Sequence, residues 1–305
     1  MPSVAFLGLG AIGTPMARHL ARTDWGLRVW NRTSARAADF AAKYAELGVT
    51  QAATPAAAAR GADVVITCFA VSGDVEMLLD GPDGLLAGLA RGATLVDCTS
   101  GDPTTSKRLA ARLAAMGVGY LDAPVSGGVV GAESGTLTVM IGGDANTIET
   151  VRPFLEAFGK KIVHCGAVGT GDAVKAVNNG LLALHLWSTA EGLAVLTSAG
   201  VDPAVALDVI NTSSGRSNAS MNLFPERVLT RAFPRTFRLA LLDKDVGIAA
   251  QVAREQKIPT PMLQLTAELY QAAHRALGEA ADHVEVVKWV EQLTGTVIKS
   301  QDASP

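Results

Sequence analysis

The sequence predicts an α/β domain with a doubly wound parallel sheet, followed by an all-α domain. Short apolar runs alternate with helical patterns through the first half of the chain, as they do in βαβ units. From about Asp172 onward the strand pattern disappears and only helical patterns follow. A chain of 305 residues is long enough for two domains with buried cores. We therefore predict a first domain over residues 1–164 and a second over residues 165–305.

Apolar runs of four or five residues mark most of the strands of the first domain. The predicted strands are Val4–Leu7, Leu27–Trp30, Val64–Cys68, Thr94–Asp97, Tyr120–Asp122, Thr138–Ile141 and Lys161–His164. Alanine-rich segments with helical spacing lie between them, for example Pro15–Arg22 and Pro103–Met116.

A long helix over Ala173–Ser198 is predicted to join the two domains. This segment is apolar nearly all round, so we expect it to be buried between domains or between subunits of a homodimer or homotetramer. The other predicted helices of the second domain are Pro203–Asn211, Leu239–Glu255, Pro261–Leu277 and Val284–Leu293. Breaks are predicted at residues 213–217 and 258–261, which are rich in Ser, Gly and Pro.

Composition argues against several classes of function. The net charge of −3, with scattered Lys and Arg, argues against a nucleic-acid-binding surface. Cys68, Cys98 and Cys165 are too few and too dispersed for a disulfide framework or a zinc site, so no metal is expected. No uninterrupted apolar stretch is predicted to span a membrane, and the N-terminus lacks the pattern of a secretory signal. We expect a cytoplasmic protein.

A glycine motif follows the first predicted strand. Gly8, Gly10 and Gly13 have the spacing Gly-x-Gly-x-x-Gly, with Ala11 and Ile12 inside the motif and a helix directly after it. In a Rossmann domain the first glycine permits a tight turn, the second allows close approach of a pyrophosphate, and the third lets the helix pack on the strand. The helix N-terminus then favours the phosphate charge. This context predicts dinucleotide binding.

The end of the second strand predicts which dinucleotide is bound. An NAD site usually has Asp or Glu here, but this chain has Asn31, Arg32 and Thr33. Arg32 can pair with a 2′-phosphate, and its two neighbours can donate hydrogen bonds to it. We predict that NADP(H) is preferred. The alternative is that Arg32 only stacks on the adenine and that NAD(H) is also used.

Loops after the next two strands are expected to line the cofactor crevice, since ligands bind at the carboxyl ends of parallel strands. Phe69 and Ala70 follow one strand, and Ser100 follows the next. Ser100 is a candidate nicotinamide contact, although a serine at this position also caps helices.

Another loop has the composition of an anion site. Ser126, Gly127 and Gly128 follow a strand that stops at Pro124. Adjacent glycines leave backbone N–H groups uncovered, and the serine adds a hydroxyl, so the loop suits a carboxylate. The alternative is an ordinary turn between strands.

Two polar residues in the long helix are candidates for chemistry. Lys175 and Asn179 are four residues apart, so they share one helix face in apolar surroundings. A lysine held there can serve as a general acid/base, and the amide can orient a substrate hydroxyl. The alternative is a snorkelling lysine or a salt bridge. Lys244 on a later helix has the pattern of a solvated face.

Four blocks together resemble the β-hydroxyacid dehydrogenase family, the relatives of 3-hydroxyisobutyrate dehydrogenase and tartronate semialdehyde reductase. The blocks start at Gly8 (Gly-Leu-Gly-Ala-Ile-Gly-Thr-Pro-Met-Ala), at Asp122 (Asp-Ala-Pro-Val-Ser-Gly-Gly), at Gly169 (Gly-x-Gly-x-x-x-Lys-x-x-Asn-Asn) and at Lys244 (Lys-Asp). They extend across about four-fifths of the chain, and the second and third also occur in the larger phosphogluconate dehydrogenases. The resemblance implies a Rossmann domain, an all-helical domain and an active site in the cleft between them.

The resemblance also implies a role for each matched residue. Ser126, Gly127 and Gly128 would hold a substrate carboxylate. Lys175 would be the general acid/base and Asn179 a hydrogen-bonding partner of the substrate, which makes these two the expected catalytic residues. Ser100 would lie near the cofactor or substrate, and Lys244 near the nicotinamide and substrate. Two departures concern the cofactor pocket: relatives usually carry Leu-Pro where this chain has Phe69-Ala70, and threonine in place of Ser100.

The function expected from the sequence is reversible hydride transfer between NADP(H) and a small β-hydroxyacid or semialdehyde carboxylate. Substrates of the 3-hydroxyisobutyrate, tartronate semialdehyde, succinic semialdehyde or glyoxylate type fit this expectation. One alternative is a reductase of an aldehyde that carries a sulfonate or another anion. A second, from a different class, is a non-catalytic NADP-binding scaffold.

Overall fold

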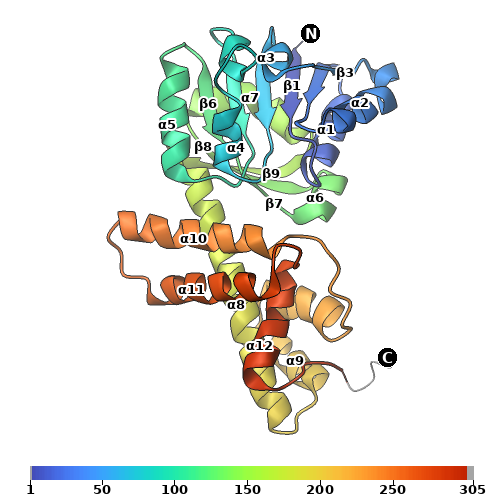
Figure 1. The fold of residues 1–305 in the computed structure, drawn as a ribbon, viewed down its shortest axis with the longest axis vertical. Coiled ribbons are helices and arrows are strands. Elements are labelled where there is room, and N and C mark those ends of the chain that lie inside the picture. The colour runs from blue at the N-terminus through green and yellow to red at the C-terminus, as the bar shows by residue number, and fades with distance from the viewer. Residues whose placement is uncertain (1, 301–305) are drawn as a thin grey trace. The chain divides into compact units, whose positions relative to one another are not determined.

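The computed structural model describes residues 2–300, which form two compact units. The first unit contains a β-sheet with flanking helices and ends at Lys175, and the second is helical and begins at Ala176 (Figure 1). An α/β unit followed by a helical unit confirms the predicted fold class. The division between the units lies inside the long helix α8 (Thr170–Ser198).

Nine strands of the described residues form one sheet in the first unit. They are β1 (Ser3–Leu7), β2 (Gly26–Trp30), β3 (Thr50–Gln51), β4 (Val64–Thr67), β5 (Thr94–Asp97), β6 (Gly119–Asp122), β7 (Val125–Ser126), β8 (Leu137–Gly142) and β9 (Gly159–Gly166). The strand order is β3-β2-β1-β4-β5-β6-β8-β7, and β9 pairs with β8. The order reverses at β1, which places the glycine motif at the switch point of the sheet.

The prediction of a parallel sheet is wrong at one end. Strands β3 to β6 along the order are parallel, but β8 is antiparallel to β6 and to β7. A parallel return would require a crossover above the sheet. Here the chain after Asp122 continues into β7 and the short helix α6 (Gly128–Ser134), which contacts α1 (Gly13–Ala21) and leads straight back into β8.

Helices cover both faces of this sheet, because alternate strand residues point to opposite faces. Val4 and Phe6 of β1 pack with α1, α2 (Ser34–Lys43) and α7 (Ala145–Glu156). Ala5 and Leu7 pack on the other face, with α3, α4 and α5. These three helices and two short 3₁₀ helices have the bounds α3 (Pro55–Ala59), α4 (Ser72–Met77), α5 (Pro103–Ala114), η1 (Ala45–Leu47) and η2 (Leu85–Ala87).

The second unit packs helices around the later turns of α8. Its elements are α9 (Pro203–Thr212), η3 (Ala219–Val228, a π-helix), α10 (Leu239–Glu255), α11 (Pro261–Leu277), η4 (His283–Glu285) and α12 (Val286–Thr294). The core contains Leu186 and Trp187 of α8, Phe224 of η3 and Tyr270 of α11. The helices predicted at Leu239–Glu255 and Pro261–Leu277 have those bounds, and both predicted breaks are present.

Helix α8 is buried on one side only within this single chain. Leu186, Ala190 and Leu193 are fully buried, but Leu181 and Val195 are 45% and 68% exposed. By length and composition alone this helix could cross a membrane, contrary to the expectation that no segment could. The core helices of soluble proteins can have the same length and composition, and α8 supplies one side of the core of the helical unit.

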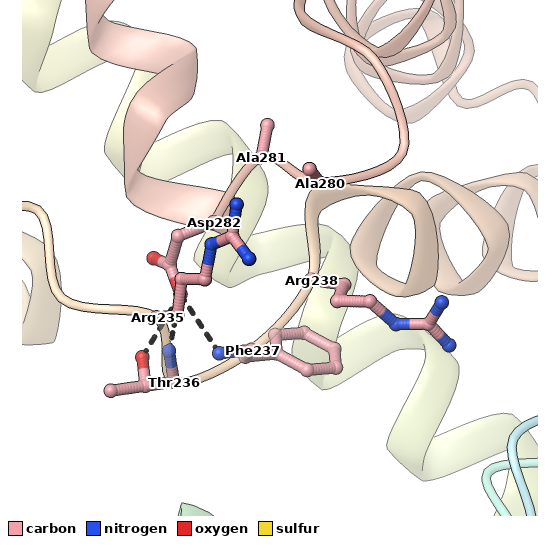
Figure 2. A pocket seen from close by; sticks show the side chains of 7 residues that line it. All are labelled: Arg235, Thr236, Phe237, Arg238, Ala280, Ala281 and Asp282. Atoms are coloured by element: carbon pink, nitrogen blue, oxygen red, sulfur yellow. Dashed lines mark hydrogen bonds between the residues drawn. The ribbon is translucent and has the colours of Figure 1, made fainter.

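A buried carboxylate anchors the loop that precedes α10. Asp282 is 1% exposed and accepts hydrogen bonds from the backbone N–H groups of Thr236 (2.7 Å) and Phe237 (2.9 Å), as Figure 2 shows. Burial alone would raise the pKa of Asp282. The hydrogen bond and charge of His283, with the two N–H groups, hold that pKa well below its usual range. The small cavity at this loop, about 190 Å³, contains none of the predicted site residues and is lined by Arg235, Thr236, Phe237, Arg238, Ala280, Ala281 and Asp282.

We predict that Asp282→Asn lowers the free energy of unfolding by about 1–3 kcal/mol at neutral pH, because hydrogen bonds to an ionised carboxylate are lost. The folded pKa is below the unfolded one, so this contribution is present above the unfolded value and disappears as the pH falls through the folded value. Urea denaturation from pH 7 to pH 3 measures the difference between variant and wild type. Asp208→Asn, at an exposed position of α9, is the control. A difference that does not change with pH would contradict the assignment.

Candidate active site

The glycine motif has two tightly packed positions and one open one. A Cβ on Gly8 (φ 106°) would lie 2.2 Å from the carbonyl oxygen of Cys68, and one on Gly13 would lie 1.9 Å from that of Gly8. Beside Gly10 no atom lies within 4 Å of the position that a Cβ would take. Gly8 and Gly13 therefore permit close packing of strand and helix, whereas the space at Gly10 is free for a group that approaches the backbone. Ala11 and Ile12 lead directly into α1, whose N-terminus begins at Gly13.

Asn31 is used to hold the glycine motif in place. Its side-chain oxygen accepts a hydrogen bond from the N–H of Leu9 (2.9 Å), and its amide nitrogen donates to the carbonyl of Thr33 (3.0 Å). Thr33 is the N-cap residue of α2. These contacts give Asn31 a structural role that sequence reasoning did not identify.

Arg32 projects from the end of β2 with its side chain 80% exposed. Its guanidinium lies 3.3 Å from the carboxylate of Asp74, in the first turn of α4. A cofactor phosphate that bound Arg32 would therefore meet a negative charge as well as a positive one. Asp74 was not predicted as a site residue.

The loops that contain Phe69 and Ser100 are held together by buried hydrogen bonds. The N–H of Phe69 donates to the hydroxyl of Thr99 (3.0 Å), and the N–H of Thr99 donates to Asp97 (3.0 Å). Asp97 also accepts from Thr67 (2.8 Å), and burial raises its pKa. Ala70 and Ser100 lie at the ends of neighbouring strands, as predicted, and both are half-buried.

The Ser126 loop keeps its donors near the surface. Ser126 is half-buried on β7, where it pairs with Thr138, and Gly127 and Gly128 are exposed with φ values of 134° and 62°. Both glycines adopt conformations that other residues rarely tolerate. A Cβ on Gly128 would meet no atom within 4 Å, so the space beside the backbone of this glycine is open.

Helix α1, which follows the glycine motif, is hydrogen-bonded to α6, the helix that follows the Ser126 loop. The ring Nε2 of His19, on α1, lies 3.0 Å and 3.1 Å from the carbonyl oxygens of Ala132 and Glu133, at the end of α6. Arg18 donates to the same carbonyl of Glu133 (2.8 Å). The glycine motif and the Ser126 loop are thus fixed on one framework within the first unit.

Lys175 is half-buried in the second turn of α8. The start of this helix is bound to the sheet by Asp122, at the end of β6. The N–H groups of Gly169 (2.7 Å) and Asp172 (3.0 Å) donate to its carboxylate. Burial raises the pKa of Asp122, and those two N–H groups oppose that shift. Asp122 thereby fixes the helix turn that precedes Lys175.

Asn179 belongs to a buried polar group in the helical unit. Its amide nitrogen donates to the carboxylate of Asp245 (2.6 Å), and the other oxygen of Asp245 lies 3.0 Å from Nζ of Lys244. Asn179 and Asp245 are 4% and 2% exposed. The structure thus brings Asn179 and Lys244 together through Asp245, which holds the amide in a defined orientation.

The residues that sequence reasoning missed are mostly carboxylates. Asp97 and Asp122 end neighbouring strands, and Asp245 follows Lys244 directly, so position at a strand end or beside a motif was the available signal. Within residues 2–300 no group of three or more His, Cys, Asp or Glu side chains could hold a metal ion. The three cysteines are free thiols, and burial, together with the charge of Asp97, raises the pKa of Cys68 to about 12.

Two family models together match most of the chain. The NAD binding domain of 6-phosphogluconate dehydrogenase matches residues 3–166. The NAD-binding region of NADP-dependent 3-hydroxyisobutyrate dehydrogenase matches residues 169–290. The first model contains the glycine motif and the Ser126 loop, and the second contains Lys175, Asn179 and Lys244.

Individual relatives are similar over nearly their whole length. The 2-(hydroxymethyl)glutarate dehydrogenase of Eubacterium barkeri is 34% identical over 296 residues, which is 97% of each chain. An NAD-dependent L-serine dehydrogenase of Pseudomonas aeruginosa is 36% identical over 88% of this chain and 91% of its own. The solved structure of Mycobacterium tuberculosis 3-hydroxyisobutyrate dehydrogenase with L-serine has a TM-score of 0.84 and 30% identity, over 95% of this chain and 99% of that one.

Substitutions at Gly10 and Gly13 should separate cofactor binding from folding. We predict that Gly13→Ala lowers the free energy of unfolding by about 1–3 kcal/mol, because the new methyl group overlaps a backbone carbonyl. Gly10→Ala should unfold at the wild-type temperature but bind dinucleotide at least about tenfold more weakly, a loss of about 1.4 kcal/mol. Thermal unfolding and fluorescence titration with NADPH and NADH measure the two effects. Wild-type affinity in folded Gly10→Ala would show that the open space is not the cofactor site.

Proposed function

The chain belongs to the β-hydroxyacid dehydrogenase family, and from this premise we propose that it transfers a hydride between NADP(H) and a small β-hydroxyacid or its semialdehyde. The reaction class follows from the family, whose named members act as dehydrogenases on hydroxyl groups. One observation carries the proposal for this chain. Lys175 and Asn179 lie one turn apart on α8, and Asn179 is buried and held by a carboxylate.

Lys175 is the proposed general acid/base. The nicotinamide cofactor, when bound, supplies or accepts the hydride. In the reductive direction the Lys175 ammonium donates a proton to the oxygen of the carbonyl carbon as negative charge develops on it. In the oxidative direction the neutral amine accepts the hydroxyl proton. Asn179 orients that hydroxyl by a hydrogen bond, and Asp245 restrains the amide so that little orientation is lost at the moment of reaction.

The Ser126 loop is the proposed site of the substrate carboxylate. The exposed backbone of Gly127 and Gly128 and the hydroxyl of Ser126 offer hydrogen-bond donors to an anion. Binding the carboxylate at a fixed place sets the position of the reacting carbon two bonds away. Lys244 is the proposed second cation for the substrate or nicotinamide, and it is already paired with Asp245.

The names of the relatives narrow the substrate class. Serine, 3-hydroxyisobutyrate and 2-(hydroxymethyl)glutarate all carry a hydroxymethyl group on the carbon next to a carboxylate. We propose that this chain acts on a 2-substituted 3-hydroxypropanoate of this kind. The substituent on the second carbon differs among the three, so a substrate panel is needed to identify it.

Arg32 supports a preference for NADP(H) over NAD(H). It lies at the end of β2, where a carboxylate would otherwise bind the ribose hydroxyls, and its guanidinium suits a 2′-phosphate. The carboxylate of Asp74 opposes this preference by electrostatic repulsion of the phosphate. We therefore propose a moderate preference for NADP(H), with NAD(H) also used.

A homodimer or homotetramer is also proposed. Besides Leu181 and Val195 of α8, Val205 and Val209 of α9 are 59% and 58% exposed. Exposed apolar side chains on adjoining helices favour association with a second copy. The cytoplasmic location and the absence of nucleic-acid and membrane partners stay predictions.

The first test is replacement of Lys175. We predict that Lys175→Ala lowers kcat by about 10²–10⁴-fold, the usual contribution of a general acid/base, while NADPH binding survives. Wild type and variant are assayed with NADPH or NADH and a panel that includes methylmalonate, tartronate and succinic semialdehydes, glyoxylate and sulfolactaldehyde. Lys161→Ala, at an exposed position of β9, is the matched control. Near-wild-type turnover of Lys175→Ala would refute the role of this lysine.

The second test concerns cofactor choice. We predict that Arg32→Ala lowers kcat/KM for NADPH by about 10- to 100-fold, with a smaller effect on NADH, since a charge-assisted hydrogen bond to phosphate is lost. Asp74→Asn should shift the ratio in the opposite direction by removing a negative charge beside the phosphate. Arg36→Ala, at an exposed position of α2, is the control. Equal losses with both cofactors would mean that Arg32 binds the adenine and not the phosphate.

A further inference from the structure

Asp172 is a buried carboxylate that has no role in the proposed mechanism. It lies in the first turn of α8 and is 1% exposed. One carboxylate oxygen accepts a hydrogen bond from the N–H of Gly101 (3.0 Å), and the other accepts from the hydroxyl of Ser106 (2.6 Å). Both partners belong to the segment that follows β5, so Asp172 connects α8 to that segment.

The connection extends further into the sheet. The hydroxyl of Tyr120, on β6, lies 3.1 Å from the hydroxyl of Ser106 and 3.4 Å from Asp97. Asp97 in turn holds Thr99, the residue before Ser100. These groups are all buried, so the loop that contains Ser100 and Gly101 is restrained from the β5 side and from the α8 side.

Three carboxylates are buried close together in this part of the first unit, and burial of their charge is unfavourable. Within residues 2–300 no salt bridge neutralises Asp97, Asp122 or Asp172. Burial, and then the charge of Asp122, raises the pKa of Asp172. A hydrophobic side chain would avoid this penalty but could accept no hydrogen bond. What the carboxylate offers at this position is the acceptance of two hydrogen bonds, from Gly101 and from Ser106.

The packing at Gly101 also depends on this contact. A Cβ on Gly101 would lie 2.8 Å from the hydroxyl oxygen of Ser72 and 3.1 Å from the carboxylate of Asp172. The loop thus approaches α8 and the start of α4 as closely as its backbone allows. A shift of Asp172 would leave the Gly101 N–H without this acceptor.

Asp172 connects two parts of the proposed site, the helix turn of Lys175 and the loop that contains Ser100. Lys175 follows it by one helical turn on α8, and Ser100 directly precedes Gly101. All of these residues belong to the first unit. We propose that Asp172 is a positioning residue for hydride transfer: through Gly101 and Ser106 it fixes the helix turn of Lys175 relative to the Ser100 loop. This inference rests on the proposed role of Lys175.

The test compares Asp172→Ala, Asp172→Asn and Ser106→Ala with wild type. Asp172→Ala should lower kcat by about 10- to 100-fold, as expected for a small misplacement of a reacting group, with a much smaller change in the KM for NADPH. Asp172→Asn should be intermediate, because its side-chain oxygen can still accept from Gly101. With deuterated NADPH the isotope effect on kcat should increase in Asp172→Ala, since the hydride step becomes slower. Asp144→Asn is the matched control: this exposed aspartate caps α7 through Thr147.

Failure of this inference is distinguishable from failure of the proposed function. If wild type turns over a substrate and folded Asp172→Ala keeps its kcat, Asp172 is not a positioning residue although the function stands. Should Asp172→Ala fail to fold, Asp172→Asn and Ser106→Ala decide by the same comparison of kcat with KM. If wild type turns over no substrate, the proposed function fails, and amide exchange measures the anchoring directly. Faster exchange of the Gly101 N–H in Asp172→Ala, which removes the acceptor, would support the anchor, and unchanged exchange would overturn it.

Discussion

The candidate site depends most on Asp122, whose carboxylate accepts hydrogen bonds from two backbone N–H groups at the start of α8. This carboxylate ends β6 and receives the N–H groups of Gly169 and Asp172, so the sheet and the start of α8 are bound at one point. The close approach is possible because Gly171 has no side chain: a Cβ there would lie 2.4 Å from the carbonyl of Met140. The Ser126 loop starts four residues after Asp122, and Lys175 lies three residues after Asp172. One carboxylate thereby sets the starting point of both the Ser126 loop and the helix that contains Lys175.

Local patterns in the sequence were sufficient for most of the fold. Short apolar runs located most strands of the sheet. The helices Leu239–Glu255 and Pro261–Leu277 are separated by a segment with Pro259, and Pro261 is the first residue of the second helix, so the local signals at this break are strong. The strand at Thr138–Ile141 was predicted, but its antiparallel direction was not, because strand direction depends on where the preceding segment packs. Here that segment, α6, packs on α1, more than a hundred residues earlier in the chain. The π-helix η3 was missed because it contains Pro225, which predicts a break.

The candidate site was predictable in its motifs but not in its supporting contacts. The glycine motif, the Ser126 loop and the pair Lys175 and Asn179 are visible as short patterns with a chemical meaning. The partners that hold them are distant in sequence: Asp245 lies 66 residues from Asn179, and Asp74 lies 42 residues from Arg32. Asn31 is a similar case: its cofactor contact stays a prediction, and the structure adds a contact with the glycine motif that no local pattern indicated. Residue type indicates what a side chain can do, and only the fold decides which partner it has.

The buried aspartates of the two units respond to acid in opposite ways. Asp97, Asp122 and Asp172 of the α/β unit have raised pKa values, so the folded form holds protons that the unfolded chain releases. Their cost to stability grows as the pH rises from the ordinary carboxyl value through the raised one, and it is relieved on acidification. Asp282 of the helical unit has a lowered pKa, so acidification removes a contribution that stabilises it. Acidification therefore relieves a cost in the α/β unit, whereas in the helical unit it removes a stabilising contribution once the pH is below the ordinary carboxyl pKa.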